Sequence, residues 1–165
     1  MTTHILMARF NAWANERLYS VAGDLSDEDY FGEKGAFFGS IHRTLNHILL
    51  VDILWRARLE GWKPEGIRSL DQVLHDAFED LRAQRRIEDA ALISYCESLG
   101  AESGGEEVAF TTLSGKGDMT LTRDQILVTL FNHQTHHRGQ IHCLLTQVGV
   151  VPPPLDVPNY LYRSA

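Results

Sequence analysis

Residues 122–147 read TRDQILVTLFNHQTHHRGQIHCLLTQ. The first four residues have the T-x-x-Q form of a capping box, which marks the amino end of a helix. Apolar residues then recur at helical spacing, and Gly149 followed by the prolines at 152–154 ends the pattern. This stretch therefore predicts a long helix that carries several histidines.

Two of these histidines, His133 and His137, lie one helical turn apart. Positions i and i+4 differ by only about 40° of rotation and about 6 Å of rise, so both rings can reach one metal ion at roughly 2.1 Å. His136 is the alternative second ligand, at about 60° from His133 on the other side. We rank His137 first because it lies closer to the direction of His133. A third ligand has to come from another helix, and His47 is the candidate because a histidine among aliphatic residues needs a partner to be buried.

Three further helices are predicted before this one. The first covers about residues 4–21, the second follows a Ser40 cap and reaches about residue 59, and the third runs from an S-x-x-Q capping box at 69–72 to about residue 99. Alternating apolar residues around a glycine-bearing turn at 108–121 predict a small β-hairpin between the third and fourth helices. Helices of this length and number predict an all-α fold, a four-helix bundle.

Composition limits the function classes. The 165 residues are 44% hydrophobic with a formal net charge of −7, which suits one domain over residues 1–165 and argues against nucleic acid as a partner, since that needs clustered Lys and Arg. Cys96 and Cys143 form no CxxC pair, so we expect neither a disulfide framework nor a thiolate zinc site. No signal peptide and no run of about 18 apolar residues occurs, and we expect a cytoplasmic protein with no membrane contact.

The ligand set itself indicates chemistry. Three neutral imidazoles leave a position open for water or substrate, which is typical of catalytic rather than structural zinc sites. Gln134 stands where zinc peptidases of the H-E-x-x-H type carry their glutamate base, so peptidase activity is disfavoured. Asp52 and Gln140 are candidates for hydrogen-bond partners that orient the imidazoles, and Gly139 is predicted to allow a close helix approach.

The whole chain resembles the DinB-like (DinB/YfiT) family of helical-bundle metalloproteins. The resemblance covers FNAWAN at 10–15, the second helix from Ser40 through LNHIL at 45–49 to Trp55, NHQTHHRGQ at 132–140 and PPLDVP at 153–158. It implies a bundle with a crossover connection, usually a homodimer, with a divalent metal on the positions matching His47, His133 and His137. Imidazole ligands favour zinc or nickel here.

The resemblance also suggests a reaction. Relatives with an assigned activity use the metal to activate a low-molecular-weight thiol, as S-transferases or as a thiol-dependent maleylpyruvate isomerase acting on a small-molecule substrate. Two alternatives stay open: a metal-dependent hydrolase acting through bound hydroxide, and a non-catalytic metal-binding protein of a binding or stress-response kind. The sequence assigns no catalytic residue beyond the three ligands.

Overall fold

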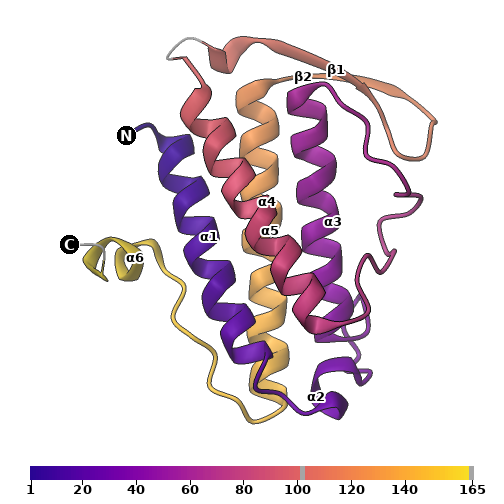
Figure 1. The fold of residues 1–165 in the computed structure, drawn as a ribbon, viewed down its shortest axis with the longest axis vertical. Helices are drawn as coiled ribbons and strands as arrows, with labels where there is room; N and C mark the ends of the chain where they lie inside the picture. The colour runs from indigo at the N-terminus through magenta and orange to yellow at the C-terminus, as the bar shows by residue number, and fades with distance from the viewer. Residues whose placement is uncertain (101–102, 164–165) are drawn as a thin grey trace.

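The computed structural model describes residues 1–100 and 103–163, and in these residues the fold is a four-helix bundle with a small hairpin, as predicted (Figure 1). The long helices α1, α3, α4 and α5 lie side by side, with α2 at one end of the bundle and α6 beside α1. No helix in the described residues is long and apolar enough to cross a membrane. The elements are α1 (Thr3–Ala22), α2 (Asp27–Phe31), α3 (Ile41–Glu60), α4 (Phe78–Ser98), the 3₁₀ helix η1 (Ser103–Gly105), β1 (Glu107–Thr111), β2 (Asp118–Thr122), α5 (Arg123–Gln147) and α6 (Val157–Arg163).

The two helices that matter most for the site begin at the caps that the sequence predicts. The Thr122 side chain accepts from the Gln125 backbone, and the Gln125 side chain accepts from the Thr122 backbone, so the capping box of α5 is complete. The Ser40 hydroxyl accepts from the Arg43 backbone at the start of α3. These caps fix the starting points of the helices and hence the heights of their histidines.

The third predicted helix begins eight residues later than we expected, because its N-cap is Ala77 instead of Ser69 and its first residue is Phe78. α3 and α4 run in the same direction, so the segment between them has to return along the length of the bundle, which is the crossover connection (Figure 1). A helix of 20 residues such as α3 is about 30 Å long, whereas residues 61–68 could span about 29 Å only if fully extended. The connection back along the bundle therefore takes up residues beyond 68, which is why α4 begins only at Phe78.

The crossover segment is held to α3 by a side chain instead of by a helix cap. Asn46 Oδ1 accepts from the backbone N–H groups of Leu74 and His75, at 2.8 and 3.0 Å. Asn46 is buried, so these bonds satisfy both the loop backbone and the amide. This anchor brings the crossover segment alongside His47.

The β-hairpin covers the end of the bundle at which α3 and α4 end and α5 begins (Figure 1). β1 and β2 pair antiparallel, with Glu107 opposite Thr122 and Thr111 opposite Asp118. Phe110 of β1 packs on Trp55 of α3, with ring centroids 5.6 Å apart. The hairpin is thereby fixed against the face of α3 that carries His47.

The bundle interior is not wholly apolar. Arg85 forms ion pairs with Asp52 and Asp89, at 2.7 and 2.9 Å, and all three side chains are buried. Asn15 donates to Asp89, and Gln134 donates to Asp52. We call this set, completed by Arg138 and Asn11, the buried charge network; its seven members are Asn11, Asn15, Asp52, Arg85, Asp89, Gln134 and Arg138.

Candidate metal centre

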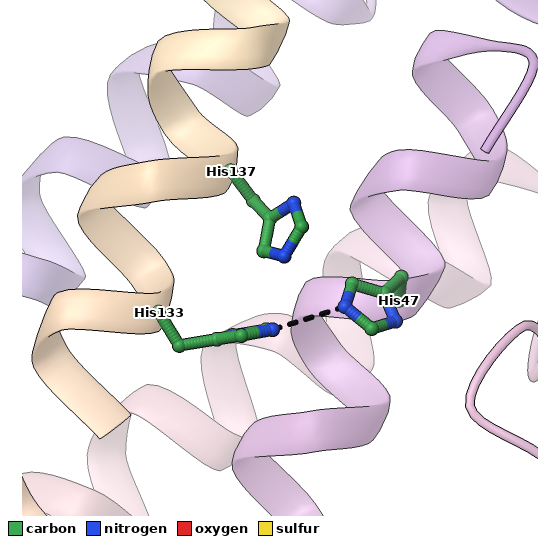
Figure 2. Close-up of side chains that lie close together, drawn as sticks. All are labelled: His47, His133 and His137. Carbon is green, nitrogen blue, oxygen red and sulfur yellow. Dashed lines mark hydrogen bonds between the residues drawn. The ribbon is translucent and has the colours of Figure 1, made fainter. Parts of the chain in front are cut away.

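Three histidine rings from two helices converge between α3 and α5 (Figure 2). His47 comes from α3, and His133 and His137 come from successive turns of α5; one nitrogen of each ring lies within 4.8 Å of the other two. His47 Nε2 is 3.0 Å from His133 Nε2, the contact dashed in Figure 2. The structure thus brings together the three residues that the sequence singles out.

Hydrogen bonds on the outer nitrogens fix two of the rings. His47 Nδ1 lies 2.7 Å from the Leu70 carbonyl, and His137 Nδ1 lies 2.7 Å from Gln140 Oε1. A carbonyl oxygen only accepts, so each Nδ1 carries the proton and each Nε2 presents a lone pair. Metal-binding histidines in proteins are held by bonds of this kind. Gln140 therefore has the orienting role predicted for it, whereas Asp52 was predicted wrongly and belongs to the buried charge network.

The third ring, that of His133, is held differently from the other two. His133 Nδ1 is buried and has no hydrogen-bond partner among residues 1–100 and 103–163. Its Nε2 faces the Nε2 lone pair of His47, so without a cation these two nitrogens have to share a proton. A metal ion would replace that proton and would accept all three lone pairs. The donor set therefore fits a divalent cation.

Burial keeps these rings uncharged. Desolvation lowers the pKa of His47, and it lowers the pKa of His137 to about 4 against the opposing effect of Gln140. Desolvation and then the neighbouring imidazoles lower the pKa of His133 to about 3. Neutral imidazole is the form that binds metals, so the cluster is ready for a cation at neutral pH.

Two predictions about neighbouring residues on α5 have different outcomes. His136, the alternative to His137, is exposed and lies outside the cluster, so the ranking of His137 first agrees with the geometry. Gly139 was predicted to allow a close helix approach, and this is wrong, because a Cβ atom placed there would meet nothing within 4 Å. The glycine lies on the exposed side of α5.

A cavity of about 780 Å³ opens beside the cluster, and we call it the histidine cavity. Phe38 stacks on the His47 ring with centroids 3.9 Å apart and lies 5.6 Å from the His137 ring. Phe37 is 86% exposed at the same cavity. The sequence analysis missed both rings, although two aromatic residues between Gly35 and Gly39 are a visible signal. The other side chains around it are Arg43, Leu70, Asp71, His136 and Gln140.

Comparisons with known proteins agree with this architecture. The model of the DinB family matches residues 1–164. The chain is 26% identical over 167 aligned positions to Protein DinB of Bacillus subtilis strain 168, an alignment that covers 94% of this chain and 91% of that protein. A crystal structure of a DinB-like protein from Bacillus cereus has a TM-score of 0.66 and 22% identity, covering 88% of this chain and 91% of that one.

Proposed function

The chain belongs to the DinB family, and we propose that it is a divalent-metal-dependent enzyme that catalyses thiol-dependent group transfer or isomerisation. The observation that carries the proposal is the convergence of three neutral imidazoles beside an open cavity. Three protein ligands leave room for a fourth from a substrate. His47, His133 and His137 would hold the ion, and zinc or nickel suits these nitrogen ligands.

The ion would supply Lewis acidity that favours the ionised form of a thiol or a water in its open position. The protein supplies orientation. The Leu70 carbonyl and Gln140 fix two imidazoles by their outer nitrogens, and the stacked Phe38 ring excludes water from one side of His47. Arg43 and Asp71 place one positive and one negative charge at the cavity, where they would orient a small polar molecule.

Thiol transfer suits this site better than hydrolysis for a reason of proton transfer. Hydrolysis by bound water needs a group that holds a proton near the cation. In the described chain no carboxylate joins the three-histidine cluster itself, so Asp71 or His136 of the cavity lining would have to take that role. In a transfer reaction the thiol sulfur bonds to an electrophilic carbon as the leaving group departs, and the thiol proton is lost to solvent. That sequence requires no base beside the ligands.

The test is turnover by the metal-loaded protein. Zinc- and nickel-loaded samples are assayed with cysteine, glutathione or coenzyme A and an electrophile such as 1-chloro-2,4-dinitrobenzene, following loss of free thiol. We expect turnover that disappears in His133→Ala and persists in His142→Ala, because His142 lies on the same helix but outside both the cluster and the lining of the histidine cavity. Hydrolysis of activated esters without thiol consumption would favour the hydrolase. Inactivity together with a large fall in melting temperature on metal removal would favour a non-catalytic role.

The resemblance to the family also predicts a homodimer. Sedimentation equilibrium of the metal-loaded protein tests this proposal directly, with a molar mass of twice the chain mass of 18.6 kDa as the expected result. A monomer at assay concentration would show that the site works without a partner subunit.

A further inference from the structure

A second cavity, of about 390 Å³, lies on the hairpin side of the histidine cluster, and we call it the hairpin cavity. His47, Leu70 and His133 line both this cavity and the histidine cavity. The histidine cluster therefore borders both cavities. Two substrates could reach the cluster from different sides.

Most of the hairpin cavity is apolar. Val51, Leu54 and Trp55 follow His47 on one face of α3, at the i+4, i+7 and i+8 positions. Leu113, in the turn between β1 and β2, closes the opposite side. A cavity of this size and lining suits a small organic molecule with an apolar body.

The polar side chains that line this cavity include Thr112, Ser114 and Thr129, and one cation, Arg58. The Arg58 guanidinium lies 4.3 Å from the Trp55 ring centroid and 4.3 Å from the Phe110 ring centroid, so two aromatic residues hold it. The side chain is half-buried, and desolvation lowers its pKa. No ion pair or hydrogen bond links the Arg58 side chain to any residue that the structure describes.

The neighbouring arginine on α3 is paired differently. Arg56 also contacts a tryptophan ring, that of Trp62 at 5.1 Å, but it forms ion pairs with Glu60 and Glu88, each at 2.6 Å. Half-buried arginines in proteins are normally paired in this way, because an uncompensated buried charge is unfavourable. The position of the Arg58 guanidinium is fixed by two aromatic rings, and no carboxylate among the described residues forms an ion pair with it.

We propose that the hairpin cavity binds an apolar monocarboxylate, with the carboxylate on Arg58 and the apolar body along Val51, Leu54 and Trp55. The end away from Arg58 then points toward His47 and His133. Arg58 stands eleven residues after His47, about 16 Å along the helix, and the longer arginine side chain can reach further toward the amino end than the imidazole does, which shortens the span. The role of this ligand as a second substrate at the histidine cluster rests on the proposed function. Its binding to the hairpin cavity can be measured separately.

The experiment compares 4-phenylbutyrate with its uncharged analogue 4-phenylbutanamide by calorimetric titration of the metal-free protein. We expect the carboxylate to bind about 10-fold more tightly than the amide in the wild type. In Arg58→Gln that preference should fall to within about 2-fold, since only the charged probe loses a partner. Arg17→Gln is the matched control, because Arg17 also lies over a tryptophan ring, 5.0 Å from that of Trp13, but outside the cavity lining.

A second variant keeps the test decisive if Arg58→Gln does not fold. Leu113→Ala removes part of the cavity wall but leaves Arg58 in place, so both probes should weaken several-fold with their ratio unchanged. Unaltered binding of both probes to Leu113→Ala overturns the inference. So does a preserved carboxylate preference in folded Arg58→Gln. If that variant loses the preference while the wild type binds no metal, the inference stands and the proposed function fails.

Discussion

Two groups of polar side chains lie between the helices of this bundle, and they differ in where their partners come from. The buried charge network contains its own counter-charges, because Arg85 lies between Asp52 and Asp89. Amides add hydrogen bonds to both carboxylates, although Asn11 Nδ2, Asp52 Oδ1 and Arg85 Nε have no hydrogen-bond partner among the described residues. The histidine cluster consists of three neutral rings and contains no carboxylate; two of its outer nitrogens donate to carbonyl oxygens. One group therefore pairs opposite charges within the protein, whereas the other offers three nitrogens that could bind a cation.

This difference indicates that the buried charge network stabilises the fold, whereas the histidine cluster is available for binding. The network is buried, and removal of Arg85 leaves two buried carboxylates without their ion-pair partner. The cluster lies beside two cavities, and its rings are neutral, so the folded chain does not depend on them in the same way. Variants in the network should therefore change folding, and variants in the cluster should change metal binding.

The largest effect is expected for Arg85→Met. The substitution removes the ion-pair partner of the buried Asp52 and Asp89 carboxylates and should lower the free energy of unfolding by about 3–5 kcal/mol. Arg86→Met is the matched control at the next position, where the side chain is exposed and pairs with exposed Glu16, and it should behave almost as the wild type. Urea unfolding measures both, and equal losses for the two variants would contradict the role of the network.

The next effect concerns metal affinity instead of stability. Gln140→Ala removes the acceptor that holds His137 Nδ1, and it should weaken zinc binding by about 10- to 100-fold. Gln147→Ala, at the far end of the same helix, is the control. Competition with a chromophoric chelator gives the affinities. An unchanged affinity for Gln140→Ala would show that the ring needs no support.

A third effect appears in the pH dependence of the metal-free protein. The unfolded histidines protonate near the ordinary value of 6.5, whereas the pKa in the folded protein is lowered to about 4 for His137 and to about 3 for His133. Below pH 6.5 the unfolded chain therefore binds more protons, and the free energy of unfolding should fall as the pH decreases toward 4. His133→Gln should show a shallower fall in urea titrations with EDTA at pH 7 and pH 5; an equal slope contradicts the assignment.

The smallest effect is expected on the surface between α1 and α4. Glu16 pairs with Arg82 and Arg86, and their hydrogen bonds lower its pKa from 4.5 to about 2. The stability that it contributes is present above pH 4.5 and is lost as the pH falls toward 2. Because these groups are solvent-exposed and screened, Glu16→Gln should change urea unfolding at pH 7 only slightly, and not at all in about 1 M salt. A salt-independent loss would contradict this.

Short-range patterns predicted the helices and the histidine pair correctly, since caps and i, i+4 spacing act within one element. The error at Ser69 arose because a local capping motif gives no information about direction, and only the parallel course of α3 and α4 requires a long return. Once the crossover is in place, Asn46 and Leu70 make its contacts with α3. The hairpin was also predicted correctly, because alternating apolar residues and a glycine-bearing turn are close together in the sequence.

The supporting residues of the site were harder to predict because their partners lie on other helices. Gln134 and Arg138 look like surface residues in the sequence, but both are buried toward the charge network. Cys143 is exposed, although a free cysteine is more often packed in the core. Polar character alone does not show whether a helix position faces solvent or a buried counter-charge on a neighbour. The contact of the Arg58 guanidinium with the Phe110 ring likewise forms only when the hairpin packs on α3.

The most direct test of the central claim is the position of the metal in crystals of the tag-free protein grown with zinc or nickel. We predict one anomalous-scattering peak per chain, at about 2.0–2.2 Å from Nε2 of His47, His133 and His137, on the side open to the histidine cavity. A peak bound through His136 or at another site, or no peak at all at these three rings under saturating metal, would contradict the account.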